Sequence, residues 1–334
     1  MTRFCKYLFL AVICLALSSA RKSEPEQGEL RTRRYVYAGG VADGKQHGFG
    51  ICRYTNGDVY AGYWNMGYKE GLGRIEYADG RMDFGQWRRG VLKAPRGRRF
   101  KVGKRCYGID AAKYQKNIDW TRLSLKARAD GRVVASGKGA EYIQPVLFAL
   151  IKSTEGVTIK DPYFRRNFEG AKRAGIIRGA YHFLSVNSPV DEQVKFFIEN
   201  TPLEKGDFPP VLDLEISKRT MQRQHGKVCR MALQWLKAVE RHYGVKPIVY
   251  TYENYYKEYL RGKGFDDYDF WIARYGAEPS ARHWEIWQLT DKGVCTGIRH
   301  KVDIDLFRGS YADLKRYIKK KGHYCPLKMD GVKN

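Results

Sequence analysis

The pattern of hydrophobic positions changes once along the chain. Across residues 35–90, short aromatic and β-branched runs alternate with Gly-containing turns such as Asn56-Gly57 and Asp79-Gly80, a pattern typical of β-hairpins. From residue 107 onward, short apolar runs of strand length alternate with amphipathic stretches of helix length. The chain is therefore predicted to contain a small all-β module followed by an α/β domain.

The first module repeats itself every 23 residues, a spacing that separates Tyr37, Tyr60 and Asp83. The same spacing relates two sets of glycines, Gly39, Gly62 and Gly85, and Gly44, Gly67 and Gly90. A fixed short period is typical of stacked units, each burying its aromatic face on the next. The pattern resembles MORN repeats, with two full units and a truncated third. The resemblance leaves open whether the repeats contact a membrane surface, another protein or the next domain.

The α/β part predicts a closed barrel. Strands are expected at residues 107–110, 146–152, 179–183, 211–215, 247–250, 270–273, 285–289 and 303–307. Helices are expected at residues 163–174, 189–200 and 227–243. Helices separate the early strands, whereas short links separate the last ones. We therefore expect a modified TIM-like (β/α) barrel with reduced C-terminal helices, in the α/β class.

Carboxylates recur at the ends of these predicted strands. Residues 209–215 run from a proline turn through apolar positions to Asp213 and Glu215, which share one face because strand side chains alternate. Two neighbouring acids separate each other's pKa values, as general acid and base chemistry requires. Asp110 closes the first strand and Asp303 begins the last. Acids so placed would meet at the barrel mouth, although solvated strand ends remain the alternative.

Aromatic side chains accompany these acids, and sugar rings pack on aromatic faces. The candidate substrate-binding residues are Tyr107, Tyr181, Tyr250, Trp271, Tyr275, Trp287 and Gln288. For most of these aromatics taken singly, packing in the core is the better interpretation. His182 is interpreted as a core histidine rather than a catalytic base.

Residues 106–310 resemble glycoside hydrolase family 25, the N-acetylmuramidase type of lysozyme. The matching segments, in order, are residues 107–110, 118–120, 152–156, 161–164, 179–183, 210–215, 271–275, 287–288 and 302–305. The resemblance implies that Glu215 is the general acid and Asp213 its partner carboxylate. Asp110 and Asp303 would tune charge and binding.

The resemblance further implies retaining cleavage of the β-1,4 bond between N-acetylmuramic acid and N-acetylglucosamine in peptidoglycan, by a carboxylate nucleophile or the substrate's acetamide. It implies no metal and no cofactor. Two features depart from the family: Asp305 stands where a neutral residue is expected, and residues 124–144 are longer than usual and predict an added hairpin at the barrel's base.

The N-terminus is typical of a secretory signal. Arg3 and Lys6 precede an apolar run and the small residues Ser18-Ser19-Ala20, and the run is too short to span a bilayer. We therefore expect an exported protein, periplasmic or extracellular. The predicted divisions are residues 1–20 (signal peptide), 21–34 (mobile tether), 35–90 (repeats), 91–105 (basic linker), 106–310 (catalytic barrel) and 311–334 (basic tail).

The net charge of the chain narrows the class of binding partner further. Lys and Arg number 61 against 36 Asp and Glu, a net charge of +25, which favours an anionic partner. Export argues against intracellular nucleic acid as the partner, so we expect peptidoglycan and a monomeric protein. Five cysteines follow the signal, without metal-ligand spacing; we expect buried thiols, with a Cys295–Cys325 bond possible but unsupported. The competing hypothesis is a non-catalytic wall-binding or scaffold protein that uses its repeats.

Overall fold

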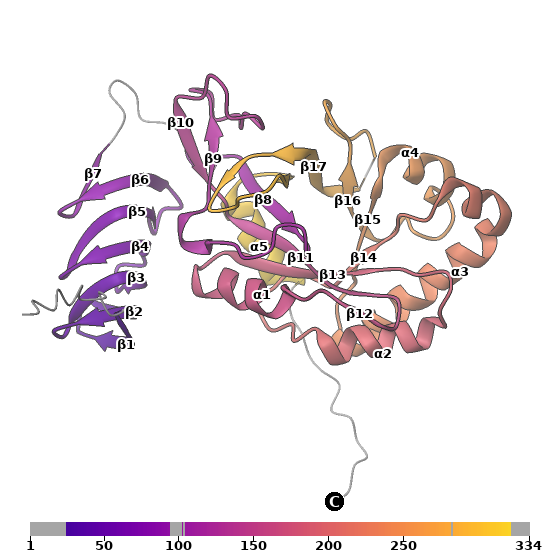
Figure 1. Ribbon diagram of the computed structural model, residues 1–334, viewed down its shortest axis with the longest axis horizontal. Coiled ribbons are helices and arrows are strands. Elements are labelled where there is room, and N and C mark those ends of the chain that lie inside the picture. The colour runs from indigo at the N-terminus through magenta and orange to yellow at the C-terminus, as the bar shows by residue number, and fades with distance from the viewer. Residues whose placement is uncertain (1–24, 94–101, 103, 282, 322–334) are drawn as a thin grey trace, which may run out of the picture.

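The computed structural model describes residues 25–93, 102, 104–281 and 283–321. The predicted signal peptide, most of the basic linker and the last part of the predicted tail, with Cys325, lie outside these residues. A small β-sheet stands beside a larger barrel-shaped domain (Figure 1). Among the helices of the described residues, none has the length and apolar character of a membrane span.

The predicted repeats form one antiparallel sheet in which neighbouring strands follow chain order. Its strands are β1 (Glu26–Arg31), β2 (Tyr35–Ala42), β3 (Lys45–Tyr54), β4 (Val59–Asn65), β5 (Tyr68–Glu76), β6 (Met82–Arg88) and β7 (Val91–Lys93). The 23-residue period has a packing cause. The buried ring of Tyr37 covers Gly50, and that of Tyr60 covers Gly73; a Cβ atom at either glycine would lie within 2.3 Å of the tyrosine hydroxyl.

Strand β1 contradicts the predicted tether at residues 21–34. It pairs antiparallel with β2 in a continuous register from Glu26 opposite Val41 to Arg31 opposite Val36. Its side chains are mostly exposed. An edge strand is held by backbone hydrogen bonds to one neighbour, so it needs no alternation of apolar residues, and its polar sequence gave the appearance of a tether.

The α/β part closes into the predicted barrel. Its eight strands are β8 (Cys106–Ala111), β11 (Phe148–Glu155), β13 (Ile177–Phe183), β14 (Val211–Asp213), β15 (Ile248–Tyr252), β16 (Asp269–Ala273), β17 (Trp284–Gly293) and β19 (Val302–Phe307). Strand β8 pairs with both β11 and β19, which closes the ring. Strand β19 is antiparallel to its two neighbours, whereas the other barrel pairs are parallel. The short β12 (Ile159–Lys160) extends the sheet beside β11.

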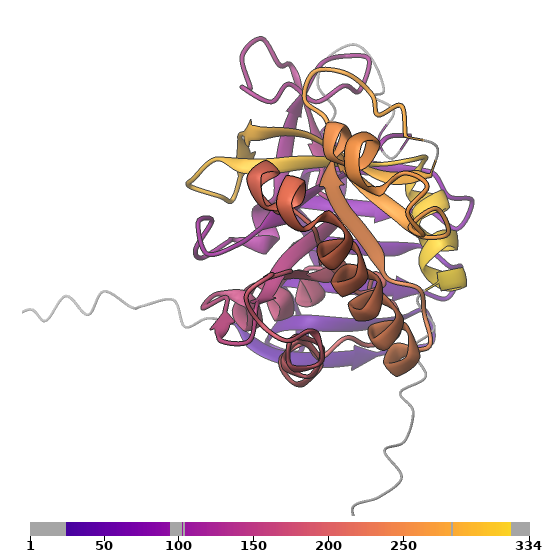
Figure 2. The same ribbon diagram turned by 90° about the vertical axis from the view of Figure 1, so that its right-hand side faces the viewer.

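The connections after the early barrel strands contain the long helices, as predicted. Helices α1 (Phe164–Arg173), α2 (Val190–Asn200) and α3 (Lys218–Tyr243) follow the early strands, and α3 crosses the outside of the barrel (Figure 2). After β15 come the short α4 (Glu253–Tyr255) and a π-helical turn (Tyr256–Leu260). Helix α3 begins earlier than predicted, at the cap Ser217, whose side chain accepts the N–H of Thr220; a kink at Gln224 (φ −135°, ψ 24°) separates this first segment from the predicted helix.

Helix α5 (Tyr311–Lys321) contradicts the prediction of a basic tail over residues 311–334. Tyr311, Leu314 and Ile318 are buried in the cluster that fills the barrel interior and its base. Their spacing of three and four residues is that of a helix face. The five lysines and arginines of residues 315–321 conceal this stripe in the composition.

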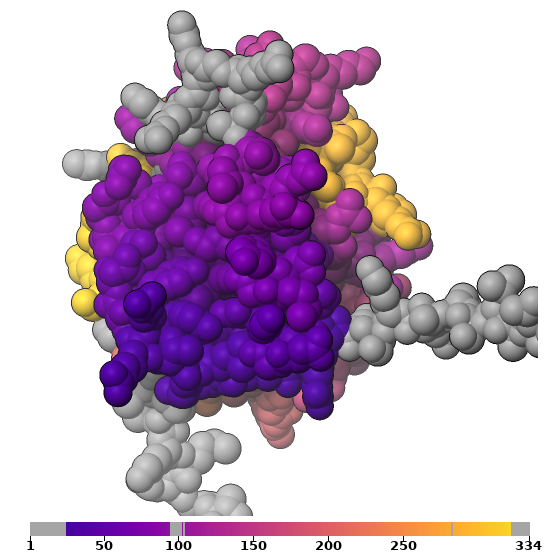
Figure 3. All heavy atoms as spheres, turned by 90° about the vertical axis from the view of Figure 1, so that its left-hand side faces the viewer, coloured from indigo at the N-terminus to yellow at the C-terminus, as the bar shows by residue number. Residues whose placement is uncertain are grey.

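The repeat sheet contacts the end of the barrel at which its strands begin, and it covers that side of the molecule (Figure 3). Arg74 donates to the carbonyl of Gly175, just before β13, at 2.9 Å, and its guanidinium lies 5.6 Å from the ring centroid of Tyr311. The hydroxyl of Tyr63 lies 2.6 Å from that of Thr121. Both contacts lie away from the ends at which the predicted acids stand.

The insertion at residues 124–144 forms the predicted hairpin. Strands β9 (Ser124–Ala127) and β10 (Tyr142–Pro145) pair antiparallel, and β18 (Cys295–Thr296) joins the other side of β9. Leu125 packs with Tyr107 and Ile109 on the outer side of β8. The hairpin therefore covers the flank of the barrel, and β10 also contacts β6 of the repeat sheet at the predicted base. The four described cysteines that follow the predicted signal are buried thiols, as expected.

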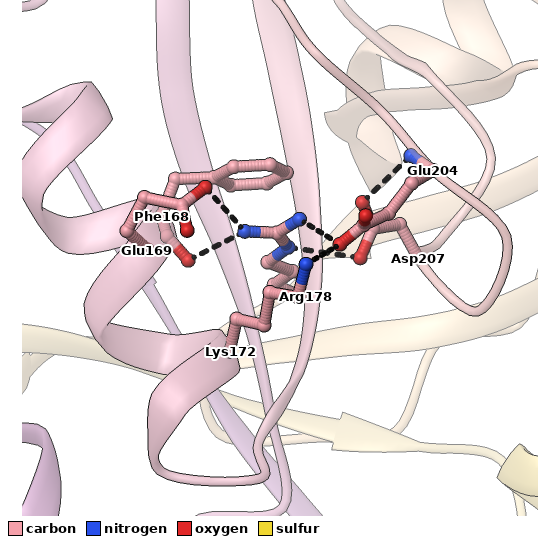
Figure 4. A network of polar contacts seen from close by, with 6 residues as sticks. All are labelled: Phe168, Glu169, Lys172, Arg178, Glu204 and Asp207. Carbon is pink, nitrogen blue, oxygen red and sulfur yellow. Dashed lines mark hydrogen bonds and ion pairs between the residues drawn. The ribbon is translucent and has the colours of Figure 1, made fainter. Parts of the chain in front are cut away.

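A buried arginine joins α1, β13 and the loop before β14 (Figure 4). The Arg178 side chain is 3% exposed and contacts carboxylates of Asp207 at 2.9 Å, Glu204 at 2.6 Å and Glu169 at 3.0 Å. It also donates to the carbonyl of Phe168 and lies 3.8 Å from that residue's ring centroid. Since β14 carries Asp213, this network positions the start of a strand that the candidate site needs.

Candidate active site

The barrel brings the four predicted acids to its mouth. Asp213 ends β14 opposite Tyr250 of β15, and Glu215 follows two residues later. Asp303 of β19 lies directly opposite Asp110 of β8. Asp110 and Asp213 are each 5% exposed, whereas Glu215 and Asp303 are half-buried. Buried carboxylates on different strands thus face one interior, as the spacing of acids along the sequence predicts.

Gln288 connects two of these acids to two tyrosines. Its amide nitrogen donates to Oδ2 of Asp110 at 2.9 Å and to Oδ2 of Asp303 at 3.4 Å. Its amide oxygen accepts the hydroxyls of Tyr250 at 3.0 Å and Tyr275 at 3.1 Å. Because the two hydroxyls occupy the oxygen side, the amide N–H groups are held toward the carboxylates.

Asp213 and Glu215 form a pair with shared electrostatics. Burial, and then the charge of Glu215, raises the pKa of Asp213 well above its usual range. Burial also raises the pKa of Glu215, against the lowering effect of hydrogen bonding by Tyr250 and Asp213. Oδ1 of Asp213 has no hydrogen-bond partner among the described residues. A pair in which one carboxyl retains a proton beside an ionised partner can perform acid catalysis.

Other predicted residues form the inner wall of the site. Tyr181 and Trp271 are 7% and 2% exposed, with ring centroids 6.0 Å apart, and both belong to the barrel interior. Tyr275 is 46% exposed and is the most accessible of the predicted aromatics. Tyr250 lies 4.2 Å from Trp271 between ring centroids. These rings offer an apolar wall beside the acids.

Tyr107 and Trp287 do not reach this interior, so the substrate-binding role predicted for them does not fit their positions. The Tyr107 hydroxyl accepts the N–H of Val133 at 3.2 Å in the outer cluster under the inserted hairpin. The Trp287 indole donates to the carbonyl of Arg274 at 2.7 Å and packs against the outer core. Their strand neighbours Gly108 and Gln288 face inward, and alternation turns these two rings outward.

Two side chains at the barrel mouth, Lys152 and Tyr252, were not among the predicted site residues. Lys152 stands opposite Tyr181 in the sheet, pairs with Glu155 at 2.6 Å, and its charge lowers the pKa of both Asp213 and Glu215. Tyr252 is 41% exposed, and its ring lies 6.3 Å from that of Tyr250. The sequence offered a signal for Tyr252, because a residue two positions after Tyr250 lies on the same face of the strand.

His182 is a core histidine, as expected. Its two ring nitrogens lie 2.8 Å from the Thr154 hydroxyl and 3.2 Å from the amide oxygen of Gln193. Its ring stacks on Trp235 at 5.5 Å. Burial lowers the pKa of His182 to about 4, so the side chain is neutral at physiological pH.

Asp305, the unexpected acid, is fully buried beneath the site. Its Oδ1 accepts the indole N–H of Trp271 at 2.9 Å. Burial, and then the charge of Asp303, raises the pKa of Asp305 well above its usual range. In the folded protein Asp305 therefore keeps its proton at pH values above about 3.9, at which the unfolded chain has released it. This carboxyl opposes folding increasingly as the pH rises toward its folded-state pKa.

Asp305→Asn is consequently expected to raise the melting temperature at pH 8 and to leave it nearly unchanged at pH 3. The amide is neutral at every pH and retains an oxygen that can accept from Trp271. Thermal unfolding followed by circular dichroism across this range measures the effect. Asp267→Asn, at an exposed position, is the matched control and should leave the pH dependence unchanged. Equal curves for Asp305→Asn and wild type would contradict a protonated Asp305.

Comparisons with known proteins agree with this geometry. The family model described as "Glycosyl hydrolases family 25" matches residues 109–298, and the MORN repeat model matches residues 37–59 and 60–80. The chain is 34% identical over 215 residues, 64% of its length, to the uncharacterized protein YegX of Escherichia coli, covering 73% of that protein. It is 29% identical over 223 residues to lysozyme M1 of Streptomyces globisporus, covering 62% of this chain and 69% of that one.

Solved structures agree as well. A family 25 glycosyl hydrolase from Bacillus anthracis has 29% identity and a TM-score of 0.52, with 63% of this chain and 92% of that chain covered. The bacterial lysozyme from Streptomyces coelicolor has 26% identity and a TM-score of 0.53, with 64% and 97% covered. The match of the family model, residues 109–298, falls on the barrel and covers more than half of the chain. The chain therefore belongs to glycosyl hydrolase family 25, as a glycoside hydrolase whose barrel is preceded by MORN repeats.

Proposed function

We propose that this protein is an exported lysozyme-type N-acetylmuramidase that hydrolyses the β-1,4 bonds between N-acetylmuramic acid and N-acetylglucosamine in peptidoglycan. The observation that carries the proposal is the half-buried Glu215 with a raised pKa beside the buried Asp213. Curated relatives named as an autolytic lysozyme of Clostridium acetobutylicum, 33% identical over 159 residues and covering 47% of each chain, and as lysozyme M1 support the substrate class.

In this proposal Glu215 protonates the glycosidic oxygen as the bond breaks. A raised pKa keeps the carboxyl protonated nearer to neutral pH, as a general acid requires. Asp213, whose pKa is raised by burial and by the charge of Glu215, orients the acetamido group, or stabilises the positive charge that develops on the sugar ring once it has given up its proton. Retention requires two displacements, and the first nucleophile is either a carboxylate or the acetamide oxygen of the substrate.

Asp110 and Asp303 act through charge and orientation. Burial raises the pKa of Asp303 to about 6, and burial together with the charge of Asp303 raises that of Asp110. Gln288 holds both in place while Tyr250 and Tyr275 hold Gln288. The exposed rings of Tyr252 and Tyr275 offer faces on which sugar rings can pack.

Export and charge complete the proposal. Residues 1–20 direct a monomeric protein out of the cytoplasm, into a periplasm or the medium. The net charge of +25 raises its concentration at an anionic wall. The contacts of Arg74 and Tyr63 with the barrel support a structural role for the repeats, as a platform under the enzyme.

Mass spectrometry of soluble fragments tests the reaction directly. Purified residues 21–334 are incubated with peptidoglycan from several bacteria. We expect released fragments with N-acetylmuramic acid at the reducing end. Fragments ending in N-acetylglucosamine would contradict the bond proposed, and the absence of release by a folded protein would favour a non-catalytic wall-binding role.

A further inference from the structure

A hollow of about 760 Å³ lies beside the barrel mouth, between residues 115–122, the start of α1 and the connection from β18 to β19. Five basic side chains line it, namely Lys116, Arg122, Arg166, Arg299 and His300. We refer to this set as the cationic groove. Its volume lies in the range of sites that hold a ligand of several residues or rings.

The positive charge of the groove is not neutralised by the fold. Lys116, Arg122, Arg166 and Arg299 are exposed, and among the described residues none of them forms an ion pair. The groove has one carboxylate, Asp119, whose Oδ1 already accepts the N–H and hydroxyl of Thr121 at 3.2 and 2.7 Å. Four cations therefore face one shared hollow without internal partners, which favours an anionic ligand.

The wall of the groove is held in a defined conformation. Gln115 is 9% exposed; its amide donates to the carbonyl of Lys301 at 2.8 Å and accepts the N–H of Ala112 at 2.9 Å. The buried Asn167 donates to the carbonyl of Lys116 at 2.9 Å. Lys116 has a φ of +54°, a left-handed conformation that costs free energy for a residue with a side chain. The surrounding hydrogen bonds maintain it and fix the start of the Lys116 side chain.

One end of the groove adjoins the ends of two strands that carry acids of the candidate active site. Ala112 follows the end of β8, which carries Asp110, and Lys301 precedes β19, which carries Asp303. Gln115 therefore joins the groove to the two strands whose acids face each other in the mouth. A polymer bound across the mouth can place its side branches in the groove.

We propose that the cationic groove binds the carboxylate-bearing stem peptides that branch from the peptidoglycan strand. The inference rests on the proposed function for the identity of the polymer. Guanidinium groups bind carboxylates through paired, charge-assisted hydrogen bonds, and a stem peptide carries several carboxylates at short spacing. The groove thereby selects strands that retain their peptides and positions them over the acids.

Binding without cleavage tests this proposal. In the Glu215→Gln background, affinity is measured by calorimetry for soluble glycan strands with stem peptides and for the same strands after an amidase has removed them. Arg166→Glu/Arg299→Glu is expected to raise the Kd for peptide-bearing strands by about ten-fold or more and to leave the Kd for bare strands unchanged. Thermal unfolding shows whether the double variant is folded.

The matched control is Arg230→Glu/Arg241→Glu, which makes the same charge change at exposed positions of α3. It should bind both ligands like the parent protein. Equal loss in the control would assign the effect to net charge and overturn the proposal, as would equal loss for bare strands. We expect free stem peptide to compete with the peptide-bearing strands for binding. Competition by inorganic polyphosphate and not by the peptide would overturn the proposal in favour of a phosphate polymer as the ligand.

The two proposals can fail separately. Wild-type cleavage of peptidoglycan with wild-type affinity in the groove variant would overturn the groove alone. Selective loss of peptide-bearing strands in the groove variant, with no cleavage by the wild-type protein, would overturn the muramidase reaction alone. Arg166→Lys/Arg299→Lys retains the charge and should recover part of the affinity, because an ammonium lacks the paired donors.

Discussion

Glu215→Gln is expected to lower the rate of peptidoglycan cleavage by about 10³-fold, within the roughly 10²- to 10⁴-fold contribution of a positioned general acid. The amide has nearly the shape of the carboxyl group but has no acidic proton to deliver. The site should therefore keep its geometry. The loss should appear in kcat, because the proton moves in the transition state rather than on binding.

The measurement is the initial rate on soluble peptidoglycan, with thermal unfolding as the test of the fold. Glu192→Gln, an exposed position in the first turn of α2, is the matched control and should retain the wild-type rate. A wild-type rate for Glu215→Gln would remove Glu215 from the proposed mechanism. Recovery of the Glu215→Gln rate on substrates with leaving groups that need no proton would support the acid role specifically.

The architecture and the four acids were predictable because both depend on local signals. Apolar runs bounded by turns indicate barrel strands, and strand ends of a barrel meet by topology. Asp110, Asp213, Glu215 and Asp303 could therefore be grouped before any contact was known. The 23-residue repeat was equally visible, since each buried tyrosine requires a glycine at a fixed position on the next strand.

The direction in which strand residues face was harder to predict. Both faces of a barrel strand are buried, so polarity does not mark which one points inward. Tyr107 and Trp287 were assigned to the site on residue type alone, and both face the outer layer. The role of Gln288 depends on four partners, three on separate strands and Tyr275 in the loop after β16, which no local pattern reveals.

Elements with polar sequences were missed for a related reason. Strand β1 depends on its backbone, and α5 depends on three buried side chains within a lysine-rich stretch. The many charged residues led to the predictions of a tether and a tail at these two positions. The three carboxylates around Arg178 were not visible either, since Glu169, Glu204 and Asp207 meet only when α1 and the loop before β14 pack on β13.

Arg178→Ala is expected to lower the free energy of unfolding by about 3–5 kcal/mol, the cost of removing one partner from a buried ion pair. The variant leaves the buried carboxylate of Asp207, which is 5% exposed, without its cation. It also removes the hydrogen bond to Phe168 and the contact with that residue's ring. Urea denaturation followed by fluorescence measures the change.

Lys172→Ala provides the matched control, because Lys172 contacts the same Glu204 at 2.6 Å but is 54% exposed. It should change the stability by at most about 1 kcal/mol, as exposed ion pairs do. Adding Asp207→Leu to Arg178→Ala should restore part of the loss, since the buried carboxylate that has lost its guanidinium partner causes much of it. A loss below about 1 kcal/mol for Arg178→Ala would mean that water replaces the guanidinium, and that the loop before β14 does not depend on this network to position Asp213.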